Sequence, residues 1–236
     1  MVSELCRHYD DRQLDLIYRW PTLRSKAWTA AFLESATNDT NIVAVLGVGS
    51  AVRADVPSVD LDLVVIAEHP EALKKKAPIE IDLRIYAADQ VGKLIQEGND
   101  LLGWTVNYGK VLWQRDGFWD SILQSWKDRV PLPSVELTLR RGDIAFRRFT
   151  TMVELGDADA AYEQALSYVT HLARAELIKR GRYPASRPEL PKDLRTVGCS
   201  SLADLLDTLI NRRPTTIAQL TKLLASTQSA ERVAGH

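Results

Sequence analysis

Two apolar runs joined by a polar loop make up the segment over residues 46–66, which reads Leu46-Gly-Val-Gly-Ser-Ala-Val-Arg-Ala-Asp-Val-Pro-Ser-Val-Asp-Leu-Asp-Leu-Val-Val-Ile66. The first run ends at Gly49-Ser50, and Asp60 and Asp62 lie at the start of the second. Successive side chains of a strand point to opposite faces, so the two aspartates share one face and the leucines beside them face the core. Carboxylates are seldom placed in an apolar strand without a reason. The segment therefore predicts two strands that meet at a charged edge.

A third strand is expected over residues 79–86, where Ile or Leu occupies the odd positions and polar or aromatic residues occupy the even ones. If this strand pairs with the second, Asp82 joins Asp60 and Asp62. Three clustered carboxylates repel one another, so a cation is expected among them. Oxygen ligands on rigid strands suit Mg²⁺, which takes a few carboxylates together with substrate phosphates. The pattern predicts a magnesium site at these three aspartates.

The Gly49-Ser50 turn supplies groups that bind an anion. Glycine lets the backbone approach a phosphate closely, and Ser50 offers a hydroxyl and an N–H at an expected helix start. Arg53 follows three residues later and can reach the same phosphates. Hydrogen-bond donors that bind phosphate, next to carboxylates that bind a metal ion, are typical of metal-assisted nucleotidyl transfer.

These residues resemble the nucleotidyltransferase superfamily of the DNA polymerase beta type. Its signature is a hydrophobic residue, Gly, then Gly or Ser, a spacer of about ten residues, and Asp-hydrophobic-Asp; here it is Val48-Gly-Ser50 and Asp60-Leu-Asp62, with Asp82 in a later strand. The match covers roughly residues 40–115. Two positions depart from the family pattern: Val59 stands where Ser or Thr often precedes the first aspartate, and Ala54 stands where a glycine often follows the arginine.

The resemblance implies a role for each matching residue. Gly49 and Ser50 would hold the triphosphate, with Arg53 at a position where the family often has an arginine. Asp60 and Asp62 would bind two Mg²⁺ ions. Asp82 would complete the second metal site or take the proton from the acceptor hydroxyl. Neither departure from the family pattern, at Val59 or at Ala54, removes a metal ligand.

The predicted fold class is α+β, with a nucleotidyltransferase domain over residues 1–130 and a helical bundle over residues 131–236. The boundary is placed at Pro131-Leu-Pro133, because β-branched runs give way there to long stretches of helix formers. The expected strands cover 42–46, 61–66, 79–86 and 106–113, and the expected helices cover 4–36 with a break near Trp20-Pro21, 88–97, 135–155, 158–180, 201–211 and 216–224.

Composition gives broad limits. The chain has 236 residues, 45% hydrophobic and 26% charged, which excludes fibrous and disordered classes. It has neither a secretory signal nor an apolar run of membrane-spanning length, so a cytoplasmic protein without membrane contact is expected. Cys6 and Cys199 are read as free thiols. Residues 1–130 carry 15 Lys+Arg and 19 Asp+Glu, a net −4, whereas residues 131–236 carry 15 and 12, a net +3.

The helical half makes kanamycin-type and related small-molecule nucleotidyltransferases the nearest relatives by architecture. It also resembles the HEPN type of bundle, although Ala165, Leu166 and Ser167 stand where the ribonuclease forms carry an arginine before His171. On its predicted helix, His171 is interpreted as a packing residue. A ribonuclease activity is therefore not expected.

The expected activity is transfer of a nucleoside monophosphate from an NTP, with ATP as the expected donor, to a hydroxyl of a small molecule such as an aminoglycoside-like compound. Pyrophosphate is released, and two Mg²⁺ ions serve as cofactors. Two alternatives stay open: a transferase acting on a protein side chain or a tRNA end, and a noncatalytic nucleotide-binding or partner-binding module. Nucleic acid is a less favoured partner, and a homodimer is compatible with the sequence.

Overall fold

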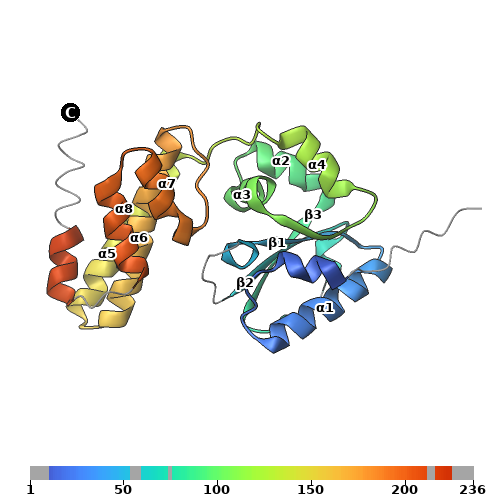
Figure 1. Ribbon diagram of the computed structural model, residues 1–236, viewed down its shortest axis with the longest axis horizontal. Helices are drawn as coiled ribbons and strands as arrows, with labels where there is room; N and C mark the ends of the chain where they lie inside the picture. Colours follow the sequence, from blue (N-terminus) through green and yellow to red (C-terminus); the bar gives the residue numbers. More distant parts are fainter. Residues whose placement is uncertain (1–10, 54–59, 74–75, 212–215, 225–236) are drawn as a thin grey trace, which may run out of the picture. The chain divides into compact units, whose positions relative to one another are not determined.

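The computed structural model describes residues 11–53, 60–73, 76–211 and 216–224. The chain divides into two compact units, Met1–Pro131 and Leu132–His236 (Figure 1). No helix among these described residues is long and apolar enough to cross a membrane. The two units are taken in turn below.

A four-stranded mixed sheet forms the centre of the first unit, with the order β3-β2-β1-β4. Its strands are β1 (Ile42–Val48), β2 (Leu61–Ala67), β3 (Ile81–Ala87) and β4 (Lys110–Gln114). β1 pairs antiparallel with both β2 and β4, whereas β2 and β3 are parallel. Apart from Asp62, the two central strands are apolar on both faces and almost wholly buried, as expected for strands covered on each side. The mixed sheet, followed by a helical unit, confirms the α+β class.

Helices cover both faces of this sheet: in Figure 1, α1 lies on one side, and α2, α3 and α4 lie on the other. The helical segments of the unit are η1 (Asp11–Leu16), α1 (Leu23–Asn38), η2 (Ser50–Val52), η3 (Pro70–Ala72), η4 (Ala88–Gln90), α2 (Val91–Gln96), α3 (Asp100–Tyr108) and α4 (Phe118–Trp126). A capping box between Thr22 and Ser25 starts α1 directly after the break at Pro21.

The sequence prediction of a strand over 106–113 is wrong in its first part. Residues 106–108 belong to α3, which starts where the Asn99 side chain accepts a hydrogen bond from the Leu102 N–H. The helix ends at Gly109, where a Cβ would lie 2.6 Å from the Thr105 carbonyl oxygen. The apolar and aromatic residues 106–108 fit the period of a strand as well as that of a helix, and the prediction did not take account of the helix cap at Asn99.

The start of the third strand also differs from the prediction. Ile79, expected to face the core, is 98% exposed in a turn, and pairing begins at Ile81. The Ile81 N–H donates to the Pro78 carbonyl, which closes this turn. Pro78 therefore sets the point at which the strand begins.

The second unit is helical, and its longest helices, α5 (Val135–Glu154) and α6 (Ala158–Lys179), lie side by side. They are followed by η5 (Arg187–Glu189), α7 (Leu190–Thr196), α8 (Ser200–Ile210) and a helical stretch over 217–224. Ser134 and Asp157 cap α5 and α6 through their side chains. Gly142 brings the two helices close, because a Cβ there would lie 3.4 Å from the His171 Cβ. His171 thus lies at a helix contact, as its packing interpretation expects.

Candidate active site

Three strand ends meet at one edge of the sheet. β1 is antiparallel to β2, and β2 is parallel to β3, so the carboxyl end of β1 lies at the same edge of the sheet as the amino ends of β2 and β3. In the ladder, Val48 pairs with Asp62, and Asp62 pairs with Asp82. Residues directly opposite one another on paired strands share a face. The structure therefore brings Asp62 and Asp82 together at the end of β1, as the alternation predicts.

The turn after β1 lies against the Asp62 carboxylate. Gly49 has a φ of +76°, a conformation that residues with a side chain rarely adopt. A Cβ at this position would lie 2.3 Å from Asp62 Oδ2. Glycine is thus required twice, by the backbone angle and by the close carboxylate. The turn and the carboxylate form one structural unit.

The segment after Gly49 is shorter than the sequence suggests. η2 is a single 3-10 turn of three residues, closed by the Arg53 N–H donating to the Ser50 carbonyl at 3.0 Å. The expectation of a helix dipole at Ser50 is therefore wrong, because one turn aligns too few peptide units. The Tyr18 and Arg19 N–H groups both donate to the Ala51 carbonyl and hold the turn from outside. Ala54 and Val59 lie outside the described residues.

Negative charge is concentrated around Asp62. The pKa of its carboxyl is raised from 3.8 to about 6, mainly by burial and then by the neighbouring charges of Asp60 and Asp82. Arg84 acts the other way, as the smallest contribution of the four. A carboxyl with a raised pKa is one whose charged form the folded chain does not fully stabilise. The site is thus suited to an added cation.

Arg84 is a site residue that the sequence analysis did not assign. Its guanidinium donates to Asp82 Oδ2 from Nη2 at 2.7 Å and from Nε at 3.1 Å. This contact raises the pKa of Arg84. Asp82 and Arg84 stand two apart on one strand, so the period-two pattern places them on one face and already contained the signal. Asp82 therefore lies beside Asp62 on one side and is bound to the guanidinium of Arg84 on the other.

The donor chemistry of the cluster fits Mg²⁺. Carboxylate oxygens are the ligands this ion prefers, and the charge around Asp62 is the kind that a divalent cation offsets. Asp60 is exposed and Asp62 is partly buried, so the pair lies at the surface of the unit. Within the part of the chain that the structure describes, no group of three or more His, Cys, Asp or Glu side chains is arranged to hold a metal ion. The fit therefore rests on the pair Asp60 and Asp62, with Asp82 held by Arg84.

Tyr108 is a second site residue that sequence reasoning missed. The guanidinium carbon of Arg53 lies 5.0 Å from the centre of the Tyr108 ring, a cation–π distance. Tyr108 is the last residue of α3, and its ring contacts Trp104 at 5.3 Å between centroids. The sequence analysis placed this tyrosine in a strand, so its approach to Arg53 could not be predicted.

Comparisons with known proteins find similar chains among the solved structures. No protein-family model matches the chain, and no curated protein matches it. The chain is similar in structure to a nucleotidyltransferase-like protein from Exiguobacterium sibiricum, with a TM-score of 0.42 and 16% sequence identity. The similarity covers 87% of this chain and 73% of the other.

Proposed function

We propose that this protein is a metal-dependent nucleotidyltransferase that moves a nucleoside monophosphate from an NTP to a hydroxyl group of a small molecule. The proposal is carried by one observation: the Gly49 turn lies directly against Asp62, which pairs in register with Asp82. A phosphate-binding turn and a carboxylate cluster in contact can hold a triphosphate and its metal together. The resemblance of the Gly49-Ser50 and Asp60-Leu-Asp62 motifs to polymerase beta-type transferases supports the same chemistry.

In this proposal each residue at the sheet edge has a separate task. The backbone of Gly49 and Ser50 and the guanidinium of Arg53 contact the triphosphate. Asp60 and Asp62 hold Mg²⁺, and Asp82, which Arg84 holds, lies beside them. When bound, Mg²⁺ supplies Lewis-acid stabilisation of the phosphate charge and lowers the pKa of the acceptor hydroxyl.

The transfer forms a bond between the acceptor oxygen and the α-phosphorus, and breaks the bond from that phosphorus to the bridging oxygen of the leaving pyrophosphate. The proton of the acceptor hydroxyl must go to a base. Asp82 is the candidate for this base, because it lies beside Asp62 on the same face and its side chain is about half exposed. Arg84 holds its carboxylate in place.

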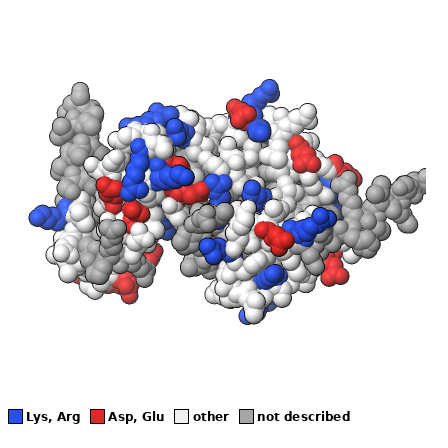
Figure 2. Space-filling view, in the orientation of Figure 1, with Lys and Arg blue, Asp and Glu red and all other residues white. Residues whose placement is uncertain are grey.

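The acceptor that fits best is a polyol or an aminoglycoside-like compound, with ATP as the donor. Residues 1–130 carry a net charge of −4, which favours a cationic sugar over an anionic polymer. On the face shown in Figure 2, Lys and Arg of the helical unit lie among Asp and Glu, so that face offers no uniform basic surface for a nucleic acid.

The test is a product assay with a panel of aminoglycosides and polyols, each of the four NTPs, and Mg²⁺. Pyrophosphate release and the mass of one added nucleotidyl group on the acceptor are measured together. We expect both signals to disappear in Asp60→Asn and Asp62→Asn and to persist in Asp204→Asn, a surface control in the helical unit. Transfer that continues in both site variants would contradict the proposal.

A further inference from the structure

The end of α3 is fixed beside the turn that follows β1. The Gly109 N–H donates to the Thr105 carbonyl at 2.9 Å, and a Cβ at position 109 would lie 2.6 Å from that carbonyl oxygen, so a residue with a side chain does not fit there. The next residue, Lys110, pairs with Gly47 of β1. Gly47 precedes Gly49 by two residues, so the sheet itself holds the last residue of α3 near the Gly49 turn.

The Tyr108 ring is held in turn by a buried neighbour. Trp104, one helical turn earlier, is 8% exposed, and its ring centroid lies 5.3 Å from that of Tyr108. Aromatic pairs at this separation attract beyond the area they bury. The ring of Tyr108 is therefore a fixed platform, half-buried, with Arg53 5.0 Å from its centre.

We propose that Tyr108 is a positioning residue that orders Arg53 for binding the triphosphate, an inference that rests on the proposed function. Arginine has a long side chain that loses much rotamer freedom when it binds a ligand. A guanidinium already held over a ring loses less of that freedom when the phosphates arrive. Cation–π attraction acts between the guanidinium charge and the face of the ring, so this contact and hydrogen bonds from the guanidinium to a phosphate can exist together.

The ring, rather than the hydroxyl, carries this effect. Tyr108→Phe keeps an aromatic face and is expected to bind triphosphate like the wild type. Tyr108→Leu keeps an apolar side chain without that face, and is expected to weaken binding by about 3- to 30-fold, the range that cation–π contacts typically give. The same Leu substitution in an Arg53→Gln background is expected to change binding by less than about 2-fold, because its partner is already absent.

The experiment measures binding of inorganic tripolyphosphate with Mg²⁺ by isothermal titration calorimetry, which avoids any dependence on the base. The proteins are the wild type, Tyr108→Phe, Tyr108→Leu, Arg53→Gln and the double variant with Gln at 53 and Leu at 108. Thermal melting of each protein shows whether it is folded. A loss in Tyr108→Leu that disappears in the Arg53→Gln background, with Tyr108→Phe normal, is the expected result.

The possible failures are distinguishable. A wild type that does not bind tripolyphosphate contradicts the phosphate site and with it the proposed function. A wild type that binds, together with a Tyr108→Leu variant that binds equally well, overturns the role of Tyr108 alone. Equal losses from Tyr108→Leu with and without Arg53 would also overturn it, because they would show a structural effect that does not act through the arginine.

Discussion

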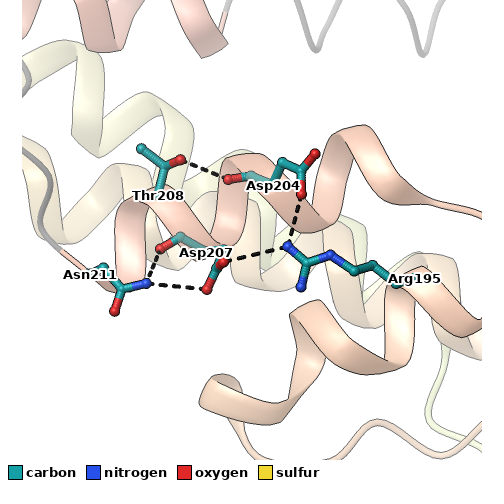
Figure 3. A network of polar contacts seen from close by, with 5 residues as sticks. All are labelled: Arg195, Asp204, Asp207, Thr208 and Asn211. Carbon is teal, nitrogen blue, oxygen red and sulfur yellow. Dashed lines mark hydrogen bonds and ion pairs between the residues drawn. The ribbon is translucent and has the colours of Figure 1, made fainter.

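The aspartates of the helical unit and those at the sheet edge differ in how they contact arginine. In the helical unit, Asp204 and Asp207 of α8 share Arg195, which donates to them at 2.8 Å and 3.4 Å (Figure 3). At the sheet edge, Asp62 is flanked by Asp60 and Asp82, and the one arginine that lowers its pKa, Arg84, is bound to Asp82. In the first arrangement both carboxylates contact the arginine, whereas in the second the arginine contacts Asp82 and the Asp62 carboxyl keeps a raised pKa. The difference separates a stabilising surface network from a candidate active site.

The largest expected effect is on activity. Asp62→Asn removes a charge from the proposed metal site, and we expect nucleotidyl transfer to fall on the order of 1000-fold or more, as loss of several kcal/mol of transition-state stabilisation implies. Asp204→Asn, its counterpart in the helical unit, is expected to stay within about 2-fold of the wild type, since it alters a surface pair. Steady-state rates of pyrophosphate release measure both. Equal losses in the two variants would remove the distinction drawn here.

A glycine pair tests whether the turn and the carboxylate are one unit. Gly49 and Gly181 have similar φ values, +76° and +72°, but open space surrounds the place of a Cβ at Gly181. Gly181→Ala is expected to lower the free energy of unfolding by about 1 kcal/mol through backbone strain alone. Gly49→Ala should lower it by about 2–3 kcal/mol, because its methyl group must also displace the Asp62 carboxylate. Urea unfolding measures both, and equal losses would show that the carboxylate moves at no cost.

Stability against pH gives a third test, in the presence of EDTA. The pKa of Asp62 is raised to about 6 in the folded chain, so its charge destabilises the fold above that pH. We expect Asp62→Asn to raise the free energy of unfolding on the order of 2 kcal/mol near pH 8, with the gain shrinking as pH falls from about 6 to 4 and the wild-type carboxyl becomes protonated. Asp204→Asn should show no such gain. A destabilised Asp62→Asn would contradict the electrostatic account.

The smallest effect is expected at Arg195. Its contacts with Asp204 and Asp207 are made on the surface, where solvent and salt screen them. Arg195→Gln is expected to lower the melting temperature slightly at low salt and not at high salt, with activity unchanged. A large loss that persists in high salt would show that this network is more than a surface feature.

Part of the strand pairing at the sheet edge could be predicted from the sequence. Alternation within the two strands places Asp62 and Asp82 on one face, and the ladder pairs them. The same reasoning fails at residues 106–108, where an apolar and aromatic run fits either period and the cap at Asn99 determines the helix. The contact between Arg53 and Tyr108 joins residues 55 positions apart, so only the folded chain shows it.

One ion pair could be predicted from the sequence, and another could not. Asp82 and Arg84 stand on one strand, so their contact follows from local geometry. Arg195 reaches Asp204 and Asp207 from a different helix, and its choice of partner depends on how α7 packs against α8. Tertiary packing of this kind has no periodic signal in the sequence.

The central claim is that the sheet edge at Gly49 and Asp62 binds an NTP together with Mg²⁺. The most direct measurement is the melting temperature of the purified protein with each of the four NTPs, with and without Mg²⁺, beside Asp60→Asn and Asp62→Asn. Ligand binding to the folded state raises the melting temperature by mass action. The account predicts a rise that requires both Mg²⁺ and a nucleotide and is lost in the two variants. A rise that persists unchanged in both variants, or that does not need Mg²⁺, would contradict it.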